Sequence, residues 1–217
     1  MDTYERLYHS PDISMILDNI NEVLNKGEKG MFRGCHGRYH TMFVVDTVEY
    51  LLKSLSYDSK TIELGKIAAL LHDIGNIAGR NKHAQKSAAL ASVFLNDIED
   101  LPSTEKDIII QAIGDHTDGK NISSPIGAAL LLADKVDVSK RRRLHFEPID
   151  DWYSNLLQIE DVGVNAFGTE IAIGFITNET FDKELFVIGY RKYLDLITKA
   201  AKCLDCSCTY QFNGVKE

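Results

Sequence analysis

The sequence lacks the features of a secreted or membrane-spanning protein. It has only four cysteines in 217 residues, and three of them crowd near one end, so there is no spaced extracellular disulfide framework. Its apolar runs, such as Ile67–Leu71, are far too short to cross a bilayer. The first residues carry neither the basic start nor the apolar stretch of a signal peptide. We therefore expect a cytoplasmic location and no membrane partner.

An excess of positive charge is also missing. The chain has 24 Lys and Arg residues against 32 Asp and Glu residues, which gives a net charge of −8. General nucleic-acid binders are normally basic, so we expect no nucleic-acid partner. With 44% hydrophobic and 26% charged residues, the composition is that of an ordinary globular protein, long enough for one full domain plus a modest extension.

Strand-like patterns are absent between residues 11 and 138, where apolar residues recur at helical spacing. Asp58, Ser124 and Pro125 are residue types that begin a helix. A glycine-rich loop over residues 27–37 separates the first two predicted helices. The predicted helices cover residues 11–25, 40–55, 59–72, 82–95 and 104–116, and a last one begins at residue 125.

The pattern changes after about residue 150, where apolar and polar residues begin to alternate. Two such runs flank the turn-like residues 167–170, which predicts a β-hairpin. The elements predicted here are strands over residues 162–166 and 171–175, a helix over 181–204 and a strand over 206–212. We therefore predict a mainly α fold, with a helical domain over residues 1–150 and a small α+β appendage of ββαβ order over residues 151–217.

Histidines and aspartates stand where the helical patterns expect apolar core. These residues are His40, His72, Asp73, His116 and Asp134. An unpaired carboxylate in such a setting costs several kcal/mol, so it needs a cation, strong donors or a proton. Taken singly, a histidine on an apolar face is more often a hydrogen-bonded core residue, and an aspartate near a helix end is usually a cap. Their joint occurrence favours a metal site.

The segment LLHDIGN, residues 70–76, is the centre of a wider pattern that begins at His40 and ends at Asp134. This pattern resembles the HD-domain metal-dependent phosphohydrolase superfamily over about residues 35–143. HDIGN is close to the family's usual HDIGK, with Asn76 in place of the common lysine. This replacement puts in doubt any phosphate-binding role that the lysine would carry. The stretches AIGDHTDG and LLLADKVD resemble a subgroup that includes the bacterial symmetrical diadenosine tetraphosphate hydrolases.

The resemblance implies a helical HD domain that holds one or two divalent metal ions. The implied ligands are His40, His72, Asp73 and Asp134 for one ion, with His83 and His116 for a second ion that Asp73 bridges. Mixed imidazole and carboxylate ligands suit Fe, Mn, Zn, Co or Ni. His36 is the rival first ligand, but the apolar stripe begins at His40, which we prefer. The alternative for His83 is an ordinary surface histidine beside Lys82.

The implied chemistry is hydrolysis of a phosphate ester or anhydride of a nucleotide or related small molecule by metal-activated water. We expect catalytic roles for Asp73 and Lys135, and phosphate binding by Lys135, Arg142 and Arg80, because phosphate oxygens need positive partners. The basic run Lys140–Arg143 has a competing interpretation as a solvated helix terminus. Asp115 or Asp118 could orient the attacking water, or could simply be solvated residues at a helix end.

Several features remain open at the level of sequence. Cys203, Cys206 and Cys208 could suggest another metal, but buried free cysteines are the simpler interpretation. Trp152 and Tyr153 could stack on a base or serve only as hinge packing. The appendage is expected either to cover the pocket or to form a dimer sheet through an exposed strand edge. Two functions compete with hydrolysis, a non-catalytic nucleotide sensor and an HD-type di-iron oxygenase.

Overall fold

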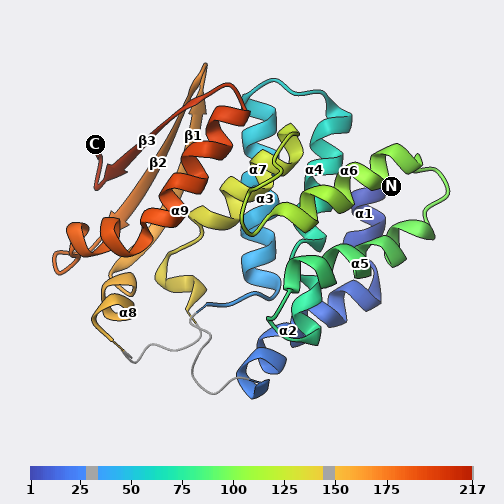
Figure 1. The fold of residues 1–217 in the computed structure, drawn as a ribbon, viewed down its shortest axis with the longest axis horizontal. Coiled ribbons are helices and arrows are strands. Elements are labelled where there is room, and N and C mark those ends of the chain that lie inside the picture. Colours follow the sequence, from blue (N-terminus) through green and yellow to red (C-terminus); the bar gives the residue numbers. More distant parts are fainter. Residues whose placement is uncertain (28–33, 144–149, 217) are drawn as a thin grey trace.

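A helical bundle and a small β-sheet lie side by side, with the long helix α9 (Lys183–Cys203) between them (Figure 1). The structure is a computed structural model that describes residues 1–27, 34–143 and 150–216. Helix α9 packs against α7 (Pro125–Val136) of the bundle and against β3 (Ser207–Phe212) of the sheet. Within the described residues, no helix is both long and apolar enough to span a membrane.

The bundle confirms the six predicted helices, with boundaries shifted by a few residues. Asp58 caps its helix by accepting a hydrogen bond from the backbone N–H of Thr61, and Ser124 accepts one from Gly127. A short first helix was missed, and the part of the predicted glycine-rich loop over residues 28–33 lies outside the described residues. The elements are α1 (Thr3–Tyr8), α2 (Pro11–Gly27), α3 (Arg38–Ser54), α4 (Ser59–Leu71), η1 (Ile74–Ala78), α5 (His83–Asn96), α6 (Ser103–Asp115), α7 and η2 (Lys140–Arg142).

Helix α7 is the central helix of the bundle. Every residue from Ile126 to Val136 is buried, and the helix packs against α3, α4 and α6 as well as α9. A helix that is apolar on all sides is expected at such a position. Asp134 and Lys135 lie in its last turn, so the fold buries two charged side chains that must find partners inside the protein.

The C-terminal part confirms the predicted ββαβ order and adds two short elements. The helix α8 (Asp151–Leu156) precedes the hairpin of β1 (Ile159–Phe167) and β2 (Glu170–Thr177), and β4 (Val215–Lys216) follows β3. The strand order is β1-β2-β3-β4, with β2 and β3 parallel and the other pairs antiparallel. The parallel pair requires a crossover, which α9 supplies. The strand β4 pairs with β3 only at Gln211 and Phe212, so among the described residues it covers the end of this strand and leaves residues 207–210 without a partner on that side.

One continuous buried core runs from the first helix to the sheet. Helix α9 contributes apolar residues at spacings of three and four, including Phe186, Tyr190, Leu194 and Ile197. Residues 144–149, which contain the predicted boundary near residue 150, lie outside the described part of the chain. The division into domains over residues 1–150 and 151–217 therefore stays a prediction.

The three C-terminal cysteines are not alike. Cys206 is buried and Cys208 is partly buried, but Cys203 is exposed, so the prediction of buried cysteines is wrong for Cys203. The reason is that the last turn of α9 presents Lys202 and Cys203 to solvent. Cys206 also precedes β3 rather than lying in it. None of the described candidate metal clusters includes a cysteine.

Candidate metal centre

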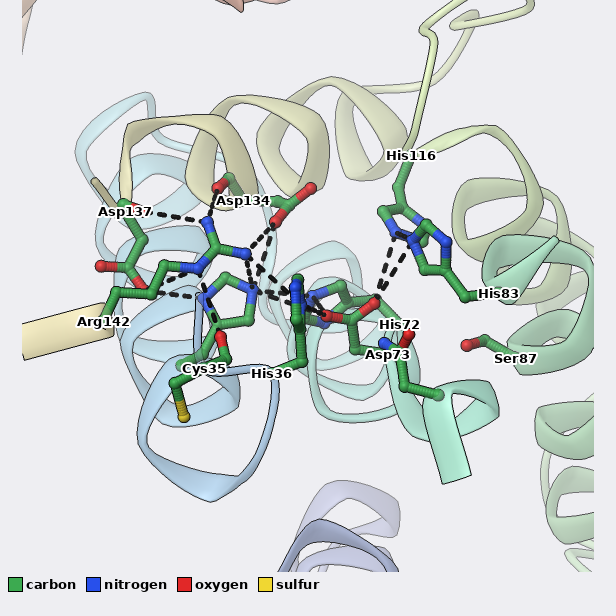
Figure 2. A network of polar contacts seen from close by, with 12 residues as sticks. Cys35, His36, His72, Asp73, His83, Ser87, His116, Asp134, Asp137 and Arg142 are labelled. Carbon is green, nitrogen blue, oxygen red and sulfur yellow. Dashed lines mark hydrogen bonds and ion pairs between the residues drawn. The ribbon is translucent and has the colours of Figure 1, made fainter. Parts of the chain in front are cut away.

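Five elements of the bundle bring the predicted ligands to one buried place. His40 lies in the first turn of α3 and Asp134 in the last turn of α7. His72 and Asp73 follow the C-terminus of α4, and His116 follows that of α6. His83 is the first residue of α5 and is 6% exposed, so the interpretation of His83 as a surface histidine is wrong. Figure 2 shows the side chains of His72, Asp73, His83, His116 and Asp134 gathered at this place.

Asp73 lies at the centre and turns its two oxygens to different groups. Oδ2 is 2.7 Å from Nδ1 of His36, 3.5 Å from Nε2 of His72 and 3.7 Å from Nε2 of His40. Oδ1 is 3.5 Å from Nε2 of His83 and 3.8 Å from Nε2 of His116. A carboxylate in this arrangement can serve two neighbouring cation sites at once.

The ring orientations of three histidines are set by hydrogen bonds at Nδ1. Nδ1 of His72 is 2.7 Å from the carbonyl oxygen of Ala69, and Nδ1 of His116 is 2.6 Å from that of Ile113. A carbonyl only accepts, so both rings donate through Nδ1 and keep a lone pair on Nε2. Nδ1 of His40 is 2.7 Å from Oδ2 of Asp137. Such outer partners are typical of metal-binding histidines.

Two Nε2 atoms therefore face each other at short distance. Nε2 of His40 is 3.3 Å from Nε2 of His72, and each ring uses Nδ1 for a partner elsewhere. Facing lone pairs in a buried site need a proton or a metal ion between them. Oδ1 of Asp134 is 3.2 Å from Nε2 of His40 and supplies negative charge at the same point. The donor set thus fits a divalent transition metal.

The charge states also suit metal binding. Burial lowers the pKa of His116 to about 3 and that of His83 to about 4, so both rings are neutral at pH 7. Burial opposes ionisation of Asp73, but His72 and the other positive neighbours hold the pKa of this carboxyl well below its usual value. Burial and Arg142 lower the pKa of His40, whereas Asp134 and Asp137 outweigh them and raise it. Neutral imidazoles and ionised carboxylates are the forms that bind metals.

Three groups of ligand atoms lie close enough to hold an ion. Within each group, all ligand atoms lie within 4.8 Å of one another. The groups are His36, His40 and Asp73; His40, His72 and Asp134; and His72, Asp73 and His116. These groups contain five of the six predicted ligands and add His36, whose Nδ1 already contacts Asp73. The sixth, His83, belongs to none of them, although its Nε2 is 3.2 Å from that of His116. The preference for His40 over His36 as first ligand stays a prediction. It is supported by Nε2 of His40, which faces Nε2 of His72 and Oδ1 of Asp134 while Nδ1 bonds to Asp137.

Arg142 lies mostly buried beside the cluster, with 12% of its side chain exposed, rather than at a solvated helix terminus. Its Nη2 is 3.2 Å from Nε2 of His40 and 3.6 Å from Oδ1 of Asp134. Nη1 donates to the carbonyl oxygen of Asp137 at 2.8 Å, and Nε donates to that of Cys35 at 3.3 Å. The guanidinium therefore ties the segment before α3 to the chain that follows α7. The solvated interpretation holds for Lys140 and Arg141, which pair with Glu160 and Asp161 of β1.

A cavity of about 240 Å³ adjoins the cluster. Asp134 and His36 line it from the metal side, and all three predicted phosphate-binding residues, Arg80, Lys135 and Arg142, line it as well. Nζ of Lys135 is 2.5 Å from Oδ2 of Asp134, and Nη1 of Arg80 is 3.5 Å from Oδ1 of Asp73. Each of these two cations is thus placed between a predicted metal ligand and the open space. A small anion in the cavity would meet several positive groups at once.

Two acidic residues considered for water orientation do not line this cavity. Asp118 is exposed and pairs with Lys120 at 2.9 Å. Asp115 is partly buried and accepts a long hydrogen bond of 3.4 Å from Asn121. Their interpretation as helix-end residues therefore fits the geometry better.

Sequence reasoning missed one residue of the cluster, Asp137, and ranked another, His36, second. Asp137, the partner of His40, is 1% exposed and lies three residues after Asp134. A second aspartate just beyond an apolar helix was the available signal. His36 was set aside because it lies in a glycine-rich loop, although it is buried and its backbone N–H is held by the side-chain oxygen of Asn21 at 2.9 Å.

A match to a family model agrees with this geometry. A model of the HD domain family matches residues 37–145, which is half of the chain. Comparison with curated proteins finds no match. Among solved structures, the chain is similar to a predicted HD superfamily hydrolase from an uncultured Thermotogales bacterium, at 25% identity and a TM-score of 0.44 over 64% of this chain and 75% of that one. HD domains bind divalent metals. On the family match, which spans His40 to Asp134, this chain belongs to the HD domain family.

Proposed function

We propose that this HD-domain chain is a metal-dependent phosphohydrolase that cleaves a phosphate ester or anhydride of a nucleotide or a related small molecule. One observation carries the proposal: the buried cluster of histidines and aspartates adjoins a cavity that Arg80, Lys135 and Arg142 also line. A metal centre alone would fit many reactions. Its position beside three cations favours a substrate with several negative charges, which is the chemistry of phosphate.

The proposed ligands are His40, His72, Asp73 and Asp134 for one ion, and Asp73, His83 and His116 for a second. When bound, a divalent ion lowers the pKa of a coordinated water toward about 7 and polarises a phosphoryl oxygen. The chain's own contribution is to keep the His83 and His116 rings neutral, to orient three of the histidine rings through Nδ1, and to keep both carboxylates ionised.

The cations have separate tasks in this proposal. Lys135 lies between Asp134 and the cavity, where its ammonium group can stabilise negative charge that develops on the phosphoryl oxygens. Arg142 is held by three backbone carbonyls, which leaves Nη2 facing the cluster in a fixed position. Arg80 donates to the side-chain oxygen of Asn76 at 3.2 Å. Asn76 occupies the position of the lysine in HDIGK, and in this proposal it orients the Arg80 guanidinium.

The size of the cavity bears on the substrate. Ligand pockets for drug-sized molecules are about 300–1,000 Å³, and this cavity of about 240 Å³ is slightly smaller. It suits one nucleotide unit better than a whole dinucleoside polyphosphate. We therefore propose nucleoside phosphates as the first candidate substrates. Diadenosine tetraphosphate is the second candidate, and only one half of it would enter the cavity.

The test is release of phosphate from a panel of substrates by protein loaded anaerobically with Fe²⁺ or Mn²⁺. The panel includes nucleoside mono-, di- and triphosphates, diadenosine tetraphosphate, cyclic nucleotides and inorganic polyphosphate. Asp73→Ala runs beside the wild type as the control for contaminating phosphatases. Turnover that this variant loses supports the proposal. No turnover by protein shown to hold metal contradicts it and favours a nucleotide sensor or an oxygenase.

A further inference from the structure

The cavity beside the metal cluster has a second wall that the HD family match does not include. Trp152 of α8 and Gly189, Tyr190 and Tyr193 of α9 line the same cavity as Asp134 and Lys135. All four lie beyond residue 145, where the family match ends. The C-terminal part of the chain therefore contributes to the pocket, and its contribution is mainly aromatic.

Close packing holds Trp152 in this wall. A Cβ atom added to Gly189 would lie 2.6 Å from Cζ3 of Trp152, so the indole lies directly on the backbone of α9. Its ring is also stacked near Phe186 and Tyr190, with centroid distances of 6.2 and 6.3 Å. Only a glycine at position 189 permits this approach, which fixes one side of the indole against the helix while Trp152 stays partly exposed.

Tyr190 and Tyr193 connect this wall to the cationic part of the cavity. The hydroxyl group of Tyr190 donates to the carbonyl oxygen of Lys135 at 2.7 Å. The rings of Tyr190 and Tyr193 are 4.7 Å apart, and Nζ of Lys135 lies 5.9 Å from the centre of the Tyr193 ring. Tyr193 remains 36% exposed. The aromatic surface thus begins next to the ammonium group that faces the proposed phosphate position.

A cavity that served inorganic phosphate or polyphosphate alone would gain nothing from these rings. Aromatic side chains stack on flat rings, and base–aromatic stacking changes affinity by about 10-fold or more per base. We propose that Trp152 and Tyr193 bind the flat ring of the substrate, a nucleobase, while Arg142, Lys135 and Arg80 bind its phosphate. This inference rests on the proposed function for the phosphate end, but it adds a specificity-determining site in the C-terminal part of the chain.

Trp152 is the only tryptophan of the chain, so its fluorescence reports on this wall alone. The direct test titrates zinc-loaded, full-length protein with hydrolysis-resistant phosphonate analogues of the four common nucleoside monophosphates. The control, ring-free in the sense that it lacks the flat aromatic ring of a base, is the matching analogue of ribose 5-phosphate. At least one ring-bearing analogue should change the emission of Trp152 and bind about 10-fold more tightly than the ring-free control. Equal affinity, or binding without a change in emission, would overturn the proposal, as would failure of every nucleotide analogue to bind.

Three variants and one matched control separate stacking from packing. Trp152→Leu and Tyr193→Leu should lower kcat/KM about 10-fold for a nucleoside phosphate and leave it within about 2-fold for ribose 5-phosphate, while Tyr193→Phe should retain the wild-type preference. Ile188→Ala is the control, because Ile188 is 75% exposed beside Gly189 and does not line the cavity. Equal losses on both substrates would mean a structural role only and would overturn the proposal.

The two proposals can fail separately. Hydrolysis of ring-free phosphates as fast as of nucleotides would leave the phosphohydrolase standing and remove the ring site. Binding of nucleotide analogues that depends on Trp152, without hydrolysis of any phosphate, would leave the ring site standing and remove the phosphohydrolase.

Discussion

His40 and His72 face each other through their Nε2 atoms at 3.3 Å, while each ring uses Nδ1 for a partner on its outer side. The outer partners are Oδ2 of Asp137 and the carbonyl oxygen of Ala69. Both rings are fully buried, so water cannot satisfy the inward nitrogens. The two buried outer partners thus hold the two nitrogens face to face. Arg142 can donate to Nε2 of His40 at 3.2 Å, but a shared cation would stabilise both nitrogens at once.

This relationship predicts different effects for the two rival first ligands. His40→Gln should weaken metal binding about 100-fold, because it removes an inward-facing nitrogen. His36→Gln should weaken it only about 10-fold, because His36 acts through Asp73, to which its Nδ1 already bonds at 2.7 Å. Calorimetric titration of metal-depleted protein with Zn²⁺ measures both. If His36→Gln loses as much metal affinity as His40→Gln, the preference for His40 as the first ligand is wrong.

Asp73 should be required at both proposed sites. Asp73→Asn should lower kcat at least about 100-fold and reduce the metal content, because the amide cannot supply two charged oxygens to the two groups of histidines. Asp118→Asn is the control, since Asp118 is exposed and pairs with Lys120. Its turnover should stay within about 2-fold of wild type. A large loss in Asp118→Asn would restore its role in orienting water and place the reacting centre elsewhere.

Gly75 of the HDIGN segment is expected to resist any side chain. A Cβ atom there would lie 2.3 Å from the backbone nitrogen of Ser87 and 2.7 Å from the backbone oxygen of His83. Gly75→Ala must therefore move α5, and it should lower the free energy of unfolding by about 3 kcal/mol. In contrast, nothing lies within 4 Å of a Cβ at Gly114 of α6, so Gly114→Ala should raise it by about 0.5–1 kcal/mol.

Urea denaturation of both glycine variants measures the two free energies. The helical glycine serves as the matched control because the same atom is added in each case. Stabilisation by Gly75→Ala, or destabilisation of similar size by both variants, would contradict the close contact between Gly75 and the backbone of α5.

Arg142 should contribute to stability as well as to binding. Arg142→Gln leaves Asp134 and the carbonyl oxygens around it without their buried cation, and it should lower the free energy of unfolding by about 3 kcal/mol. Arg141→Gln removes an exposed pair with Asp161 and should cost less than about 1 kcal/mol. Thermal and urea unfolding of the two neighbouring variants compares them. Equal losses would contradict the buried role of Arg142.

Much of the fold could be predicted because its helices carry strong local signals. Asp58 and Ser124 are residue types that commonly cap the first turn of a helix, and both do so here. The alternating runs around residues 167–170 form the expected hairpin. The helices α1 and α8 were missed because six residues hold too little periodicity to distinguish them from loops. The strand β4 has only two residues, and it forms because β3 offers it a partner.

That the proposed ligand residues lie in one buried cluster could be predicted, but their surroundings could not. Aspartates and histidines on apolar faces mark buried charge, and the HD pattern relates them across the chain. The Nδ1 partners of the rings depend on backbone carbonyls and on Asp137, which no local pattern specifies. The wall formed by Trp152 and Gly189 depends on how α9 returns across α7, which only the tertiary structure determines.

The central claim is that this buried cluster is a metal centre, and metal analysis tests it most directly. Wild-type protein dialysed against Mn²⁺ or Zn²⁺ and then passed through a desalting column should retain one or two ions per chain by mass spectrometry. His72→Ala should retain fewer under the same conditions, because His72 belongs to two of the three ligand groups. Wild-type protein that retains no more metal than His72→Ala would contradict the account.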